Sequence, residues 1–270
     1  MVVRGRCSGA VARCVLRAVC CLFFSATGAV AQETQSSGID AFSFMPRYDF
    51  YLSVAALAHE DPRFEWDTHF GGDVDVLAFA AARVNALAEY EAVLGSEFRS
   101  FDPNQGNYTL EASVASRVKH TELAAVVHHV SRHLSDRPKR FSVDWNTVAV
   151  RVGRQLAYRA TGFDIRATLG KVFKRSYVDY DWIGDVEVAA RRQLRSGVGI
   201  FGRGMCTVYA GDAGTPDRTR AGVRLEGGVR LGGEDGASEL FAGYEHRVDA
   251  YPLQRSAEGW AFAGVRLVSR

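Results

Sequence analysis

Hydrophobic and polar residues alternate with a period of two along most of the chain, from about residue 47 to the C-terminus. In the range 220–231, Val223 and Leu225 fall on one face, while Arg224 and Glu226 fall on the other. Successive side chains of a strand point to opposite faces. The pattern therefore predicts strands that are apolar on one face and densely charged on the other.

Turn residues divide this pattern into twelve predicted strands. They cover about 47–58, 65–79, 82–94, 106–118, 121–133, 141–154, 161–173, 178–190, 197–210, 218–231, 237–248 and 258–268. Strands of ten residues or more exceed the roughly 5–6 residues usual in soluble proteins. They match a tilted strand that crosses a bilayer. The range 80–94 is also rich enough in Ala and Glu to be compatible with a helix.

The predicted connections alternate between two kinds. Polar and mostly longer connections lie at 95–105, 134–140, 211–217 and 249–257, and short ones lie at 80–81, 119–120 and 232–236. Outer-membrane barrels have long extracellular loops and short periplasmic turns. We therefore predict an all-β fold, a transmembrane antiparallel up-and-down β-barrel of about twelve strands with both termini in the periplasm. The alternative is a water-soluble sandwich or barrel with its apolar face turned inward.

The N-terminus predicts export. Four arginines precede a short apolar run at 18–26 and a small-x-small cleavage site at 29–31, the pattern of a secretory signal peptide. We expect a signal peptide at 1–31, a short periplasmic segment at 32–46, and the barrel at 47–270. The expected location is the outer membrane of a Gram-negative bacterium, reached through the barrel assembly machinery.

Removal of the signal peptide changes the charge and the cysteine content. Loss of its four arginines turns the formal net charge of +2 into −2, which gives no reason to expect a nucleic-acid partner. Four of the five cysteines also leave with it, and Cys206 remains alone. The mature chain therefore has no disulfide framework and no cysteine-based metal site.

Candidate chemistry lies at the end of the fifth predicted strand. His129 and Ser131 are two residues apart and so share a face, about 6.6 Å from one another. A serine hydroxyl needs an adjacent base to act as a nucleophile, and a third group such as Asn146 can orient that base. Alternation places all three residues on the lipid-facing side, where polar groups are costly unless they are functional or covered.

The stretch 128–146 resembles the active-site region of outer-membrane phospholipase A, a twelve-stranded barrel that hydrolyses phospholipid acyl esters. The similarity rests on His-x-Ser at 129–131, Ser-Asp at 135–136, Pro138, Ser142 and Trp-Asn at 145–146. The resemblance implies Ser131 as nucleophile, His129 as base, Asn146 as the residue that orients it, and Ser142 as a calcium ligand. It also implies membrane lipid as substrate and allows a homodimer.

The sequence departs from that family in two ways. Arg132 and His133 stand where the family has Asn-Gly, and the loop that follows is longer. The range 102–138 also resembles a Gram-negative barrel family of unknown function that carries a His-x-Ser-x-His-Leu-x-Asp run. This second resemblance supports the fold and leaves the activity open.

Other interpretations of the same residues remain open. His128, His129 and His133 could form a polar girdle at the membrane rim or bind a metal ion. The charged faces of the strands could form structural salt bridges or line a selective pore. Two functions therefore stand side by side: a phospholipase A-type serine hydrolase, and a non-enzymatic barrel that is a narrow pore or a structural protein.

Overall fold

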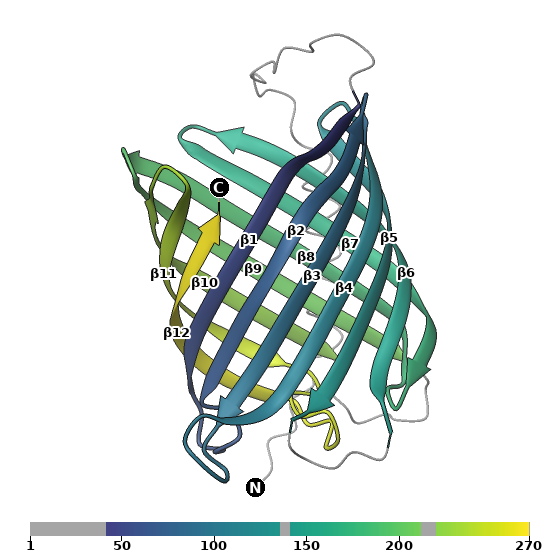
Figure 1. Cartoon of the computed structure of the whole chain (residues 1–270), viewed down its shortest axis with the longest axis vertical. Helices are drawn as coiled ribbons and strands as arrows, with labels where there is room; N and C mark the ends of the chain where they lie inside the picture. Colours follow the sequence, from purple (N-terminus) through teal and green to yellow (C-terminus); the bar gives the residue numbers. More distant parts are fainter. Residues whose placement is uncertain (1–41, 136–140, 212–219, 270) are drawn as a thin grey trace, which may run out of the picture. The chain divides into compact units, whose positions relative to one another are not determined.

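Twelve strands form one closed antiparallel barrel in the computed structural model, which describes residues 42–135, 141–211 and 220–269 (Figure 1). The strands are β1 (Ser43–Ala58), β2 (Trp66–Phe79), β3 (Ala82–Gly95), β4 (Asp102–Val118), β5 (Thr121–Leu134), β6 (Val143–Tyr158), β7 (Thr161–Ser176), β8 (Tyr180–Arg195), β9 (Val198–Gly211), β10 (Ala221–Gly232), β11 (Gly236–Arg247) and β12 (Glu258–Ser269). Each strand pairs with its neighbours in sequence, and β1 closes on β12. The predicted twelve-stranded all-β barrel is confirmed.

Each predicted strand is present, and most are longer than expected. The Ala- and Glu-rich range 82–94 is strand β3 and not a helix. β8 continues to Arg195, five residues beyond its predicted end, because Gln193 and Arg195 still pair with β9 after the apolar alternation has stopped. β1 begins at Ser43, so the barrel starts four residues before the predicted boundary at 47. The predicted signal peptide lies outside the described residues.

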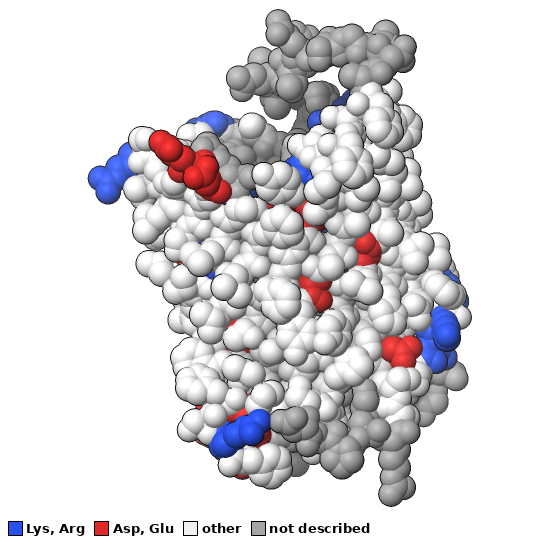
Figure 2. Space-filling view, in the orientation of Figure 1, with Lys and Arg blue, Asp and Glu red and all other residues white. Residues whose placement is uncertain are grey.

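The two faces of the sheet are opposite in polarity to those of a soluble barrel. On β1, Leu52 and Val54 are exposed on the outer wall, whereas Ser53 and Ala55 are buried toward the interior. Other strands repeat this alternation, and the wall visible in Figure 2 carries few charged side chains between its two ends. An outward apolar belt of this kind suits lipid and is unfavourable in water. Within the described residues, no helix is long and apolar enough to cross a membrane.

Ion pairs fill part of the lumen. Arg266 is largely buried and donates to Glu239 at 2.9 Å and to Glu226 at 2.9 Å, and Arg230 donates to the same Glu239 at 2.6 Å. The side chains of Glu226 and Glu239 are only 1% and 3% exposed. A buried charge requires a partner, so these charged faces form structural networks on this side of the barrel.

The connections differ at the two ends of the barrel. The end that holds Ser43 and Ser269 has turns of two or three residues, and the other end has connections of three to ten residues. The longest connection, between β11 and β12, folds inward, since Ala250 is fully buried and Arg132 donates to the carbonyl oxygens of Asp249 and Ala250. The long-loop end of the lumen is therefore covered by chain on the β11–β12 side.

The loop asymmetry predicts the orientation in the membrane. A cysteine introduced at Phe98, in the β3–β4 loop, should react with a membrane-impermeant maleimide on intact cells. A cysteine at Glu234, in the β10–β11 turn, should react only after the cells are opened. Both variants are made with Cys206→Ala as background, and the reverse labelling pattern would show that the barrel is inserted the other way round.

The lumenal network predicts a strong effect of Arg266. Arg266→Ala leaves Glu226 and Glu239 without their shared partner in a buried environment, which should lower the free energy of unfolding by about 3–5 kcal/mol. The measurement is urea-induced unfolding followed by tryptophan fluorescence. Arg192→Ala on the exposed end of β8 is the matched control and should change stability by less than about 0.5 kcal/mol. Equal effects of the two variants would contradict a structural role for this network.

Candidate functional site

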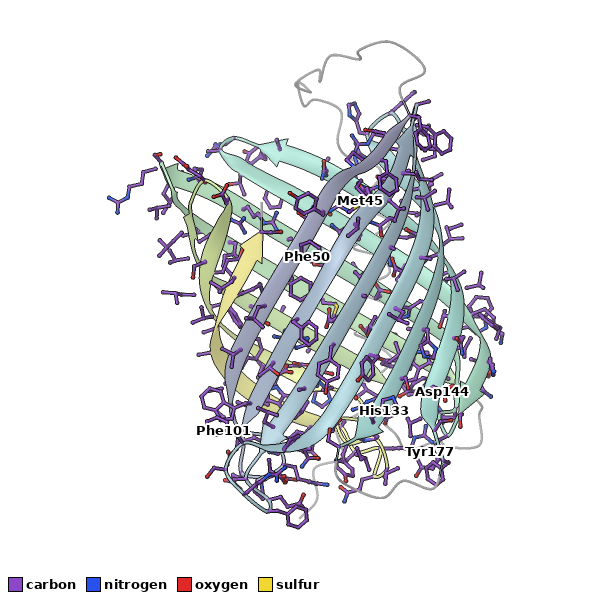
Figure 3. All side chains as sticks on the ribbon, viewed as in Figure 1. Met45, Phe50, Phe101, His133, Asp144 and Tyr177 are labelled. Carbon is purple, nitrogen blue, oxygen red and sulfur yellow. The ribbon has the colours of Figure 1, made fainter. Side chains whose placement is uncertain are left out.

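A group of polar residues continues the lipid-facing side of β5 toward the long-loop end. Leu123 and Val127 are exposed on this side, and His129, Ser131 and His133 follow in the same phase. Figure 3 shows His133 close to Asp144 of β6, where these two neighbouring strands approach the long loops. The structure therefore places the predicted residues His129 and Ser131 on the outer wall, near the expected extracellular rim.

The predicted partner of His129 is in contact with it. Asn146 lies directly opposite His129 in the β5–β6 ladder, and His129 Nδ1 is 3.0 Å from Asn146 Oδ1. An amide oxygen only accepts, so this bond places the histidine proton on Nδ1. The other nitrogen, Nε2, is then a free acceptor, which is the form of imidazole that can remove a proton from a hydroxyl.

The hydroxyl of Ser131 is bonded to a different histidine from the one expected. Its Oγ lies 2.9 Å from Nε2 of His133, which follows it by two residues, whereas His129 turns sideways to Asn146. Both histidines share the face of Ser131, one on each side along the strand. Ser131 can therefore form a hydrogen bond with either imidazole. Spacing in the sequence alone does not decide between His129, two residues before it, and His133, two residues after it.

Two charged residues of this site were not selected from the sequence. Asp144 lies opposite Ser131 in the β5–β6 ladder, on the same face as Asn146. Lys174 of β7 lies opposite Asn146, beside a β-bulge that interrupts the β6–β7 register. Bulges often redirect side chains next to active sites. The alternation of β6 could have revealed Asp144, but the bulge that places Lys174 leaves no signal in the sequence.

Ser142 lies in the connection just before β6, and its carbonyl oxygen accepts a hydrogen bond of 2.9 Å from Ser176 Oγ. Calcium usually takes six to eight oxygen ligands, several of them carboxylates. Among the described residues on this face of β5 and β6, Asp144 is the carboxylate that could join Ser142. This donor set does not fit a calcium site, so no step of the chemistry below depends on calcium.

Aromatic rings extend the site around the outer wall. Tyr108 of β4 meets the edge of His133 with ring centroids 5.4 Å apart, and Tyr90 of β3 lies 4.8 Å from Tyr108. Phe70 of β2 continues the row at 5.4 Å from Tyr90. Amphipathic rings of this kind occupy the interface between lipid and water. The row extends the outer-wall site from His133 across β4 and β3 to β2.

An open depression of about 620 Å³ lies elsewhere, beside the β1–β2 loop. Its lining includes His59, Asp61 and Glu258, and Arg63 donates a hydrogen bond that holds the pKa of Asp61 below its ordinary value. These residues belong to β1, β12 and the loop between β1 and β2, away from the β5–β6 ladder around the barrel. The depression is therefore separate from the Ser131 site.

Comparisons with known proteins identify the fold and no family. No family model and no curated protein matches this sequence. Outer-membrane phospholipase A from Escherichia coli has a similar structure, with 9% sequence identity, coverage of 82% of this chain and 92% of that chain, and a TM-score of 0.53. The Salmonella typhi enzyme, solved as a dimer with bound calcium, is also 9% identical over 82% of this chain and 90% of that chain, with a TM-score of 0.52.

A channel has the same degree of similarity. An outer-membrane channel from Pseudomonas putida F1 is 10% identical over 90% of this chain and 99% of that chain, with a TM-score of 0.54. At such low identity the likeness shows the outer-membrane barrel fold, which an enzyme and a channel share. The function must therefore be argued from the residues of the site.

Proposed function

We propose that this barrel is a serine hydrolase that cleaves phospholipid acyl esters in the outer leaflet of the outer membrane. The observation that carries the proposal is the His129–Asn146 hydrogen bond on the lipid-facing wall, next to Ser131 on the same face. Three uncovered polar residues in lipid are unfavourable for stability. With Ser131 turned toward His129, the three would serve as nucleophile, base and orienting group.

The proposed reaction proceeds in two steps. Ser131 Oγ attacks the ester carbonyl carbon while His129 Nε2 takes the serine proton, and the lysolipid oxygen leaves with that proton. Water then attacks the acyl-serine, again with His129 as base, which releases the fatty acid and restores the serine. Asn146 keeps the proton of His129 on Nδ1 throughout. Ser131 must leave its hydrogen bond with His133 and turn toward His129 before the first step.

Neighbouring residues suit a lipid substrate. Lys174, opposite Asn146, supplies a positive charge that can attract the phosphate of a headgroup. The aromatic row from His133 to Phe70 offers a surface for the glycerol and the upper acyl chains. We further propose that the mature chain, after cleavage of the signal peptide at 31, is inserted by the barrel assembly machinery, and that the apolar wall allows a homodimer.

A narrow pore is the second candidate, favoured by the likeness to the Pseudomonas putida channel. The structure of the lumen argues against a pore, because buried ion pairs cross the interior of the barrel. Arg247 of β11, for example, donates to Glu91 of β3 at 2.6 Å. Charges held by direct partners in this way hinder the passage of hydrated ions.

The hydrolase proposal predicts the effects of three substitutions. Ser131→Ala should lower the rate of acyl-ester cleavage by about 1000-fold or more, and His129→Ala should have a similar effect because the two groups act together. Asn146→Ala should lower the rate less, because it removes orientation and not a reacting group. The measurement is release of fatty acid from phospholipid by refolded protein in detergent, with and without calcium.

Two controls make this test specific. His133→Ala should retain most of the activity if His129 is the base. Loss of activity in His133→Ala, with activity retained in His129→Ala, would identify His133 as the base instead. Glu226→Gln in the lumen should leave the rate within about twofold, because the reaction takes place on the outer wall. If Ser131→Ala keeps full activity, or if the wild type cleaves no phospholipid, the proposed function is wrong.

The pore candidate has its own test in planar bilayers. We expect no stable single-channel steps from the wild type, because ion pairs span the lumen. Arg247→Ala removes ion pairs between β11 and the β2–β3 side of the lumen, and its conductance is compared with that of the wild type. Large and stable steps from the wild-type protein would favour the pore over the hydrolase.

A further inference from the structure

A second cluster of reactive side chains lies inside the barrel, separate from the Ser131 site. Asp67 and His69 of β2 and Glu91 of β3 bring one ligand atom each within 4.8 Å of one another. His69 Nε2 is 3.1 Å from Asp67 Oδ1 and 3.9 Å from Glu91 Oε1. Ligands bound at about 2.0–2.2 Å to a tetrahedral metal lie roughly 3.3–3.6 Å apart. The observed spacings bracket that range.

The atoms that face one another in this cluster make no hydrogen bond. Asp67 is 1% exposed, yet its Oδ1 accepts no hydrogen bond, and Nε2 of His69 is also buried without one. The two atoms lie within ion-pair distance, but the imidazole is not oriented to donate to the carboxylate. A buried polar atom without a hydrogen bond is unfavourable. Two such atoms only 3.1 Å apart form a place where one cation could contact both.

A third acidic residue prepares His69 to bind a cation. Nδ1 of His69 is 2.7 Å from Glu89 Oε1, and the hydroxyl of Tyr51 donates to the other oxygen of Glu89. This arrangement places the proton of His69 on Nδ1 and leaves the lone pair of Nε2 available to a cation. Metal-bound histidines commonly donate their second nitrogen to a carboxylate in this way.

The local charges also favour a cation. Four carboxylates meet here, and the guanidinium groups in contact with them are two. The carboxylates belong to Asp67, Glu89, Glu91 and Glu245, and the guanidinium groups to Arg224 and Arg247. The excess is two negative charges when His69 is neutral and one when it is protonated.

The adjoining network has three guanidinium groups of its own for its three carboxylates. They belong to Arg203, Arg230 and Arg266, and Arg224 joins the two networks through Glu226. The three carboxylates are those of Glu187, Glu226 and Glu239. A divalent cation beside His69 Nε2 and Asp67 Oδ1 would offset this excess of negative charge.

We propose that Asp67, His69 and Glu91 bind a divalent first-row transition metal ion, such as zinc, inside the barrel. One imidazole and two carboxylates suit an ion of intermediate softness and are a poor set for calcium, which prefers oxygen ligands alone. Arg247 contacts both carboxylate ligands, and Glu89 positions the imidazole. The ion would join β2 to β3 near the long-loop end. This site is independent of the proposed hydrolase.

The test is metal binding by the mature protein refolded in detergent. Chelator-treated wild type should take up one equivalent of zinc, measured by calorimetry and by elemental analysis after gel filtration. His69→Ala should lose this equivalent. Glu89→Gln should keep it with an affinity about 10–100-fold weaker, because it removes only the group that positions the imidazole.

Two further variants test whether the zinc binds elsewhere and whether its loss could reflect misfolding. The double variant His129→Ala/His133→Ala, which removes the outer-wall histidines, should retain the zinc equivalent. Glu91→Gln keeps the shape of the side chain and should lose it, even if His69→Ala fails to fold. A folded wild type that binds no zinc would overturn the proposal. Loss of zinc only in the double variant would place the site on the outer wall.

Discussion

Closure of the sheet by the β1–β12 pairing is the constraint on which the rest of this structure depends. A strand in lipid finds no water for its backbone groups, so an open edge inside the bilayer would leave N–H and C=O groups unpaired. The register from Tyr51↔Val268 to Ala58↔Ala261 removes that edge. Once the barrel is closed, side chains along a strand face lipid and lumen in turn. The chemical environment of a residue then follows from its odd or even position in the strand.

The two environments act on polar residues in opposite ways. In the lumen, charged residues from distant strands can satisfy one another, as Arg266 does with Glu226 and Glu239. On the outer wall no such partner faces a side chain across the barrel, so a polar residue must find one on a neighbouring strand. His129 and Asn146 do so across the β5–β6 ladder. A polar group in lipid is therefore stronger evidence of function than one in the lumen.

The same reasoning distinguishes the two proposed sites. The residues around Ser131 are exceptional because of where they lie, on a wall that is otherwise largely apolar. The residues around His69 are exceptional because four carboxylates there contact two guanidinium groups and two buried atoms make no hydrogen bond. Neither feature depends on the overall fold, which an enzyme and a channel share at TM-scores of 0.53 and 0.54. Function here must be sought in local departures from a common architecture.

The sequence by itself determined the strands, the barrel and the face on which Ser131, His129 and Asn146 lie, because a period of two is a local property of the chain. Only the tertiary structure decided the partners. The bond of Ser131 to His133 depends on side-chain orientation, which spacing does not determine. The ion pair of Arg247 with Asp67 joins residues 180 positions apart, and the β6–β7 bulge sets the place of Lys174. Such contacts follow from closure and register, and neither is encoded in any short segment.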